Sequence, residues 1–208
     1  MESIGNAPAT GGKFILGITG GVGSGKSRVL EILKEEYGFR VIQADQVAKK
    51  LMEPGQESYR AVVDCLGPSI LNEDGTINRP AMAGVIFGCP EKRSQVDRLT
   101  HPLVWKTAFR EALDCPEPLV VIEAAVPSKE FRDNCREMWY VYTSRENRTA
   151  RLRESRGYTK EKTESIMDSQ ASESGFRAFS DAVIDNNGSV EETGNQIRQL
   201  LKNKIRMQ

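Results

Sequence analysis

The 208-residue sequence predicts an α/β fold in which a parallel sheet of about five strands packs against helices. Two observations support this prediction. Short apolar runs recur along the chain, and sequence with helical periodicity flanks each of them. In addition, a helix lies between the first two predicted strands, and such a crossover is right-handed and joins parallel strands.

The N-terminal part of this fold is a strand, a glycine-rich loop, a helix and a second strand. Residues 14–19 form a short apolar run that ends in glycines, which is typical of a buried strand. Residues 26–37 place apolar side chains on one helical face, and Gly38 stands where such a helix stops. Residues 40–43 predict the second strand, and Asp45 follows close to its end.

Later segments complete the sheet and add two helical regions. Apolar runs at 119–122, 138–142 and 182–184 predict three further strands. From 46 to 113 the sequence is helix-rich and interrupted by turn signals, which indicates a helical insertion on the sheet. A second charged helical stretch runs from 145 to about 177.

The composition limits the possible partners. Lys and Arg together number 29, as do Asp and Glu, so we expect no long-range field that would attract nucleic acid. No apolar run reaches membrane-spanning length and the N-terminus lacks a secretory signal pattern, so we expect a cytoplasmic protein without a membrane partner. The four cysteines form no C-x-x-C pair, which argues against a zinc site or a disulfide framework. The sequence leaves the oligomeric state open.

The glycine-rich loop matches the phosphate-binding motif G-x-x-x-x-G-K-S at Gly20, Gly25, Lys26 and Ser27. Glycines let backbone N–H groups curl around phosphate oxygens, and the start of the following helix adds unpaired donors and a positive dipole end. Lys26 is expected to hold the β- and γ-phosphates of a nucleoside triphosphate, and Ser27 to bind Mg²⁺. The alternative to a phosphate-binding site is an ordinary glycine turn between a strand and a helix. Such a turn would not need the complete motif, which favours phosphate binding. The fold class is therefore a P-loop NTPase three-layer core.

Two carboxylates follow predicted strands and are candidate metal ligands. Asp45 comes after the second strand and Glu123 after the third, and ligands bind at the carboxyl ends of such strands. One or two carboxylates suffice for Mg²⁺, which keeps several waters. Asp45 could accept a proton from an attacking hydroxyl or orient the metal. The alternatives are an N-cap role for Asp45 in a helix from Gln46 and a loop-capping role for Glu123.

Several segments together resemble the dephospho-coenzyme A kinase family. The similarity spans about 15 to 201. It is carried, in order, by Gly17 to Ser27, Ala44-Asp45, Glu53-Pro54-Gly55, Asp74 to Arg79, Val85-Ile86-Phe87, His101-Pro102-Leu103-Val104 and Val183 to Gly188. The resemblance implies ATP-dependent phosphorylation of the ribose 3′-hydroxyl of dephospho-coenzyme A, a small-molecule substrate, to give coenzyme A and ADP.

The resemblance also implies a domain organisation. Residues 1–13 are expected to form a flexible leader and 14–208 a single P-loop kinase domain. Within that domain, the implied parts are a core (14–45, 117–144 and 180–208), a helical acceptor-binding insertion (46–116) and a lid (145–179).

Roles for individual residues follow from the motif, from the strand ends and from the same resemblance. Catalysis falls to Asp45, Lys26 and Arg156, and substrate binding to Asp45, Arg79 and His101. ATP binding falls to Gly20, Gly21, Val22, Gly23, Ser24, Gly25, Lys26, Ser27, Arg28 and Arg151, and the metal ligands are Ser27, Asp45 and Glu123. Without the resemblance, two of these residues would be interpreted differently. His101 precedes Pro102 at an expected helix start and would have a structural role, and Arg79 would be an ordinary surface arginine.

The lid is expected to carry a cluster of cations. Arg145, Arg148, Arg151, Arg153 and Arg156 lie in one predicted helix, and guanidinium groups suit phosphate oxygens. Arg148, Arg151 and Arg156 could share a broad face, and the alternative is a solvated face laced with glutamates. Arg156 stands where the family has a lid arginine, and the spacing from Arg151 is one residue longer than usual.

The chain also departs from the family pattern. Gln43 replaces an aspartate, Arg28 a threonine, Lys129 a glutamate and Gly157 a frequent aspartate. The rival functions are a kinase for another small acceptor, such as a nucleoside monophosphate or a sugar acid, and a regulatory nucleotide switch. Against the switch, the guanine-reading pattern N/T-K-x-D is absent.

Overall fold

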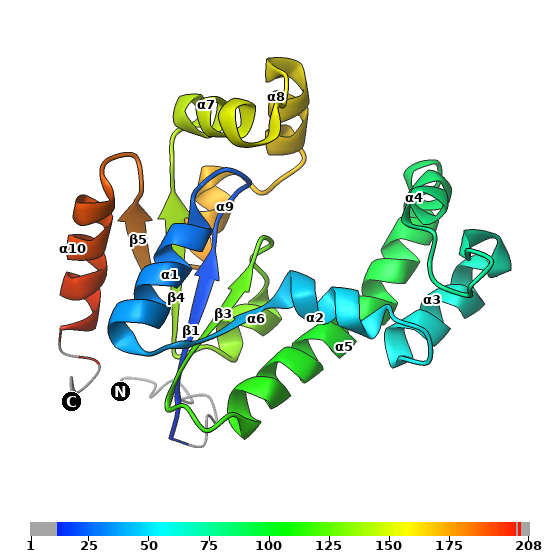
Figure 1. Ribbon diagram of the computed structural model, residues 1–208, viewed down its shortest axis with the longest axis horizontal. Helices are drawn as coiled ribbons and strands as arrows, with labels where there is room; N and C mark the ends of the chain where they lie inside the picture. The colour runs from blue at the N-terminus through cyan, green and yellow to red at the C-terminus, as the bar shows by residue number, and fades with distance from the viewer. Residues whose placement is uncertain (1–11, 203, 205–208) are drawn as a thin grey trace, which may run out of the picture. The chain divides into compact units, whose positions relative to one another are not determined.

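The computed structural model describes residues 12–202 and 204 (Figure 1). Most of the predicted leader, 1–11, lies outside the described residues. The elements, in chain order, are β1 (Phe14–Thr19), α1 (Lys26–Tyr37), β2 (Arg40–Gln43), α2 (Ala44–Leu51), α3 (Glu57–Leu66), η1 (Pro68–Ile70), α4 (Arg79–Phe87), α5 (Pro90–Asp114), β3 (Leu119–Ala124), α6 (Lys129–Asp133), β4 (Glu137–Tyr142), α7 (Arg145–Arg156), α8 (Lys160–Asp168), α9 (Glu173–Ala178), β5 (Ala182–Asp185) and α10 (Val190–Leu201).

The sheet has five strands in the order β2-β3-β1-β4-β5. Strand β1 pairs in parallel with β3 and with β4, and β4 pairs in parallel with β5. The predicted α/β fold with a parallel sheet is therefore confirmed. The glycine-rich loop follows the central strand β1, so the ends of β3 and β4 flank it on both sides.

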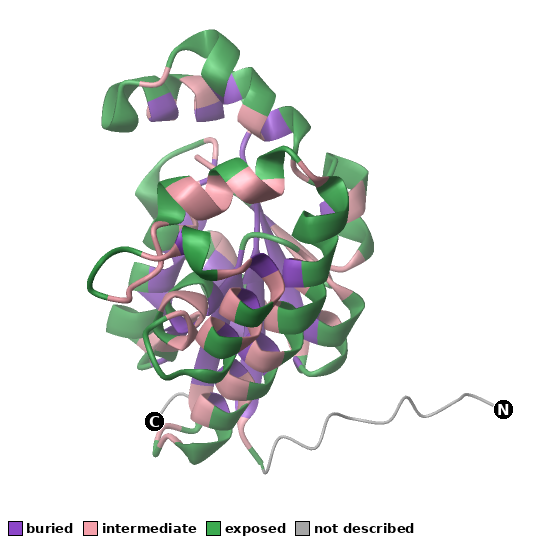
Figure 2. Ribbon diagram, turned by 90° about the vertical axis from the view of Figure 1, so that its right-hand side faces the viewer, coloured by how far each residue is buried: buried purple, intermediate pink, exposed green. Residues whose placement is uncertain are grey.

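Alternate side chains of the central strands pack into different layers. Leu16 and Ile18 of β1 join the main core, which is lined by buried residues of α1 and α10. Gly17 faces the opposite layer, where a Cβ would collide with Met138 Sδ and would lie 3.2 Å from Phe131 of α6. Buried residues follow the strands in Figure 2, as expected for a sheet covered on both faces.

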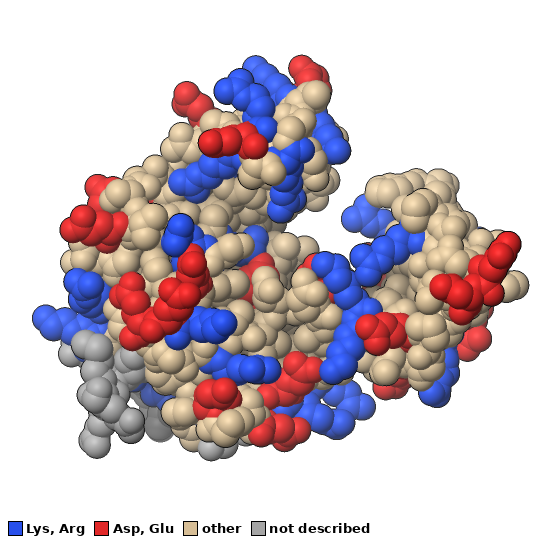
Figure 3. All heavy atoms as spheres, in the orientation of Figure 1, with Lys and Arg blue, Asp and Glu red and all other residues tan. Residues whose placement is uncertain are grey.

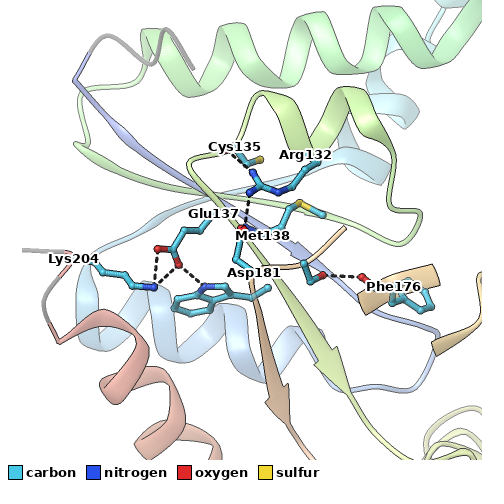
Figure 4. Close-up of polar contacts among 9 residues, drawn as sticks. Arg132, Cys135, Glu137, Met138, Phe176, Asp181 and Lys204 are labelled. Carbon is cyan, nitrogen blue, oxygen red and sulfur yellow. Dashed lines mark hydrogen bonds and ion pairs between the residues drawn. The ribbon is translucent and has the colours of Figure 1, made fainter. Parts of the chain in front are cut away.

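The ends of β4 and β5 farthest from the glycine-rich loop are tied by polar contacts (Figure 4). Asp181 accepts hydrogen bonds from the backbone N–H of Met138 (2.8 Å) and from Arg132 (2.6 Å). Glu137 accepts from Trp139 Nε1 (2.9 Å) and from Lys204 Nζ (2.7 Å). These contacts fix the start of β4 and hence the register in which its other end reaches the loop.

The described chain divides into two compact units. The first contains residues up to Ile42 and from Ala112 onward, and the second is Gln43–Glu111. The second unit has its own small core of Val62, Leu66, Ile70 and Val96. Whether these units serve as phosphate donor and acceptor parts stays a prediction.

The expected helix start at His101-Pro102 is wrong, because both residues lie inside α5. The helix starts at Pro90, a residue favoured in a first helical turn. Pro102 removes only one backbone donor, and the helix continues through it. Although α5 is long, none of the described helices could cross a membrane.

Candidate active site

The loop from Gly20 to Ser27 is shaped for anion binding. Gly25 has a left-handed conformation (φ 85°) and is the N-cap of α1, so no side chain satisfies the first N–H groups of that helix. The first turn also contains no acidic residue. A Cβ at Gly25 would collide with Asn186 Nδ2, and one at Gly21 with Arg148 Nη2. Gly25 is therefore required both by its backbone conformation and by close packing, whereas at Gly21 the guanidinium group of Arg148 packs against the loop.

Lys26 lies folded against this loop. Its Nζ donates to the carbonyl oxygen of Gly20 (2.8 Å) and lies 3.5 Å from Glu123 Oε1. The side chain is 14% exposed, and burial lowers the pKa of Lys26 from its ordinary value, while Glu123 opposes that shift. Glu123, at the end of β3, is itself buried. The ion pair with Glu123 thus favours the charged form of Lys26 in a desolvated site.

The carbonyl oxygen of Ser24 is fixed by hydrogen bonds from residues at the ends of β4 and β5. It accepts hydrogen bonds from Thr143 Oγ1 (2.9 Å) and Asn186 Nδ2 (2.8 Å). Thr193 Oγ1 in turn donates to Asn186 Oδ1 (2.8 Å), so both ends of that buried amide are engaged. The sequence interpretation gave Thr143 and Asn186 no role. They directly follow β4 and β5, so the strand-end rule that selected Asp45 and Glu123 could have found them.

Two arginines of α7 contact the same loop. Arg148 Nε donates to the carbonyl oxygen of Val22 (2.8 Å), and Arg151 Nη2 donates to that of Asn186 (2.7 Å). Arg151 Nη1 also lies 3.5 Å from the Ser24 carbonyl oxygen. Helix α7 is therefore docked on the loop through Arg148 and Arg151.

Gln170, which lies between α8 and α9, completes the contacts to the loop. Its Oε1 accepts from the backbone N–H of Val22 (3.1 Å) and from Arg148 Nη2 (2.8 Å). The sequence interpretation gave Gln170 no role, and no spacing rule points to it. Lys and Arg side chains gather over α7 and α8 in the upper part of Figure 3. Arg156, at the end of α7, lies close enough to Lys26 to contribute to its lowered pKa.

Two further predicted residues of the first unit are exposed. Arg28 pairs with Glu31 of the same helix (2.6 Å) on the surface of α1. Ser27 lies in the first turn of α1 with its residue exposed. Arg28 is thus held by a surface ion pair, whereas Ser27 is accessible to a ligand at the helix start.

The second unit contains an open cavity of about 500 Å³. Its wall includes apolar side chains of α2 and α4, together with Asp45, Lys49 and Arg79. Asp45 is 72% exposed and pairs with Lys49 (2.6 Å). Helix α2 begins at Ala44 with Gln43 as N-cap, so the alternative interpretation of Asp45 as the cap is wrong.

His101 lies apart from that cavity on α5. It lines a separate shallow hollow with Arg93, Asp97 and Arg98, and its Nε2 lies 3.8 Å from Asp97 Oδ1. The structure therefore brings Asp45 and Arg79 to one cavity but does not place His101 in its wall.

The residues around the loop offer few protein ligands for Mg²⁺. Among residues 12–202 and 204, no group of three or more His, Cys, Asp or Glu side chains could hold a metal by itself. Ser27, an exposed residue at the helix start, and Glu123, whose carboxylate lies 3.5 Å from Nζ of the adjacent Lys26, suit an ion that keeps most of its waters. Thr19 and Ser24 also have buried hydroxyl oxygens without a hydrogen-bond partner in the described chain. The residues fit a hydrated magnesium phosphate and not a closed metal cage.

Comparisons with known proteins agree with these features. The family model described as dephospho-CoA kinase matches residues 14–192. A dephospho-CoA kinase from Geobacter metallireducens is 34% identical over 196 residues, which cover 92% of this chain and 97% of that protein.

Solved structures share the fold. A protein from Thermus thermophilus superposes with a TM-score of 0.79 at 25% identity, over 93% of this chain and 99% of the other. A dephospho-CoA kinase from Campylobacter jejuni superposes with a TM-score of 0.66 at 18% identity, over 92% of this chain and 98% of the other. The family match includes both the phosphate-binding loop and the cavity of the second unit. The chain belongs to the dephospho-CoA kinase family.

Proposed function

We propose that this chain transfers the γ-phosphoryl group of ATP to the ribose 3′-hydroxyl of dephospho-coenzyme A. Its family is one of kinases, and the family reaction is the final step of coenzyme A biosynthesis. The observation that supports the donor half best is the uncapped start of α1 behind a complete phosphate-binding motif, with Lys26 folded against it. The acceptor half is proposed to be the cavity beside Asp45 and Arg79.

The donor half stabilises charge on the moving phosphoryl group. Lys26 and the N–H groups at the start of α1 bind the phosphate oxygens, and Arg156 adds a further cation. We expect Arg151, already docked on the loop, to serve ATP binding by holding α7 against it. Transfer is direct and in line, without a phosphorylated enzyme. Positioning and electrostatics supply most of the rate in such sites.

The acceptor half orients the attacking hydroxyl. Asp45 accepts or aligns its proton, and its exposed pair with Lys49 is weak enough to exchange for a ligand. Arg79 supplies a cation for the acceptor's phosphates, next to an apolar wall that includes Met52, Met82 and Ile86. We also propose that His101 contacts the acceptor, although it does not line that cavity.

We propose Mg²⁺ as the metal. Ser27 would hold it, with Asp45 or Glu123 supplying a carboxylate directly or through water. When bound, the ion supplies positive charge that neutralises phosphate oxygens. We also propose a cytoplasmic location, because the reaction consumes ATP and all four cysteines are free thiols, as is usual in a reducing compartment.

An acceptor panel tests this function. Purified protein is incubated with ATP, Mg²⁺ and, separately, dephospho-coenzyme A, a nucleoside monophosphate or a sugar acid, and ADP and phosphorylated product are measured. We expect rapid turnover only with dephospho-coenzyme A. Preference for another acceptor would assign a different kinase activity, and binding of ATP with no transfer to any acceptor would favour a nucleotide switch.

A further inference from the structure

Arg148 is a buried cation without a carboxylate partner. The residue is 9% exposed, and its hydrogen bonds go to two neutral groups, the Val22 carbonyl oxygen and Gln170 Oε1. Arg145, three residues earlier on the same helix, instead pairs with Asp168 (2.8 Å) at the surface. Within the described part of the chain, no Asp or Glu forms an ion pair with Arg148.

Such an arrangement is unfavourable without a ligand. A buried charge costs free energy unless an opposite charge compensates it. Burial lowers the pKa of Arg148. Tyr140 opposes this shift, and the nearby charge of Arg145 adds to it. Lys26 and Arg156 add positive charge close by, while Glu123 pairs with Lys26. The site therefore has an excess of positive charge that a polyphosphate would neutralise.

The guanidinium group also lies at the right part of the loop. A Cβ built on Gly21 would lie 2.7 Å from Arg148 Cζ and 2.9 Å from Nη1, so the group packs against that residue. On the same peptide segment, Lys26 Nζ lies 2.8 Å from the Gly20 carbonyl oxygen and 3.5 Å from that of Gly21. Arg148 and Lys26 thus contact the same two-residue stretch, and a lysine at this motif position reaches the β- and γ-phosphates.

We propose that Arg148 is a catalytic residue that contacts the γ-phosphoryl oxygens of ATP beside Lys26. Its Nε and Nη2 are used by Val22 and Gln170, which leaves the N–H groups of Nη1 without a partner among the described residues and available to the phosphate. Gln170 is then a positioning residue that fixes the plane of the guanidinium group. The inference rests on the proposed use of ATP and adds a residue to that site.

The test compares equilibrium binding of ATP and of ADP, because only ATP has the γ-phosphate. We expect Arg148→Ala to weaken ATP binding about tenfold or more, the scale of one lost charged hydrogen bond, and ADP binding less than about threefold. Turnover should fall about a hundredfold, as for loss of one transition-state stabiliser. Arg148→Lys should recover part of the ATP preference. Arg198→Ala, an exposed arginine on α10, is the control and should change neither the ATP nor the ADP dissociation constant.

Equal weakening of ATP and ADP in Arg148→Ala would overturn the proposal, because a residue that only supports the loop affects both nucleotides alike. If Arg148→Ala does not fold, the same comparison on Arg148→Lys decides. Gln170→Ala should lower the ATP preference about threefold while leaving the charge in place. If the wild-type protein binds ATP but does not phosphorylate dephospho-coenzyme A, the proposed function fails while the comparison still tests Arg148. Wild-type protein that binds ATP no more tightly than ADP would also contradict the role of Arg148.

Discussion

The two units hold their candidate site residues in different ways. In the first unit, Lys26 is nearly buried and Ser24 is fixed through Thr143 and Asn186. In the second, Asp45 is 72% exposed and its ion pair is to a lysine one turn away on its own helix. The phosphate-binding loop is therefore preorganised, whereas Asp45 is held only weakly before a ligand binds.

The energies of these contacts differ accordingly. An exposed pair such as Asp45 and Lys49 contributes about 0.2–1 kcal/mol to stability. A buried polar group that loses its hydrogen-bond partner costs about 1–3 kcal/mol. Substitutions at the loop and its supports should therefore alter stability together with function, and substitutions at Asp45 should alter function alone.

The largest effect is expected for Lys26→Ala. Loss of the ammonium group removes the cation proposed to hold the β- and γ-phosphates and leaves Glu123 without this ion pair. Turnover should fall at least about a hundredfold. Steady-state kinetics measures it, with the exposed Lys34→Ala on the same helix as control. Turnover within tenfold of the wild type would remove Lys26 from the donor site.

A similar loss of turnover is expected for Asp45→Asn, but without a loss of stability. The amide cannot accept the proton of the attacking hydroxyl, so kcat should fall about a hundredfold. The free energy of unfolding should change by less than about 1 kcal/mol, because the pair with Lys49 is exposed. Urea unfolding and kinetics are compared with Asp64→Asn, an exposed aspartate of α3. Near-normal turnover would contradict the role of Asp45.

Asn186→Ala tests the support of the loop. The Ser24 carbonyl oxygen loses one donor and Thr193 loses one of its two acceptors, so the free energy of unfolding should fall by about 1–3 kcal/mol. ATP and ADP binding should weaken by equal factors, unlike the result expected for Arg148→Ala. The exposed Asn195→Ala on α10 is the control. Unchanged stability would show that the loop does not depend on Asn186.

The smallest effect is on the pH dependence of ATP binding. Because burial lowers the pKa of Lys26, its ammonium group should lose its proton at a lower pH than an ordinary lysine. The charged form binds phosphate, so ATP affinity should stay level at neutral pH and decrease as pH rises through that pKa. Lys26→Arg should move the decrease to higher pH. An identical alkaline decrease in both proteins would assign it to another group.

Much of the first unit could be predicted because its signals are local. A short apolar run predicted strand β1, and apolar side chains on one helical face predicted helix α1. Both have the predicted bounds, since glycines delimit them. The contacts that support the loop could not be predicted from local signals, although the strand-end rule could have selected Thr143 and Asn186 as candidates. Gln170 lies 148 positions after Val22 in the sequence, and Asn186 lies 162 after Ser24, so no spacing rule links them.

The second unit was less predictable from residues alone. His101-Pro102 suggested a helix start, but the helical pattern on both sides of the proline continues through it. Arg79 and His101 gained a proposed role only from the family resemblance, since neither is buried nor placed by a motif with a known backbone geometry. The roles of Arg79 and His101 depend on a ligand, and the exposure of these two residues does not identify that ligand.

The most direct test of the two-site account measures binding of ATP and of dephospho-coenzyme A separately to Lys26→Ala and Arg79→Ala. We predict that Lys26→Ala loses affinity for ATP and retains it for dephospho-coenzyme A, and that Arg79→Ala shows the reverse. The expected losses are about tenfold or more, the scale of a charged hydrogen bond. Loss of both ligands in either variant, or retention of dephospho-coenzyme A binding in Arg79→Ala, would contradict the assignment of donor and acceptor sites to the two units.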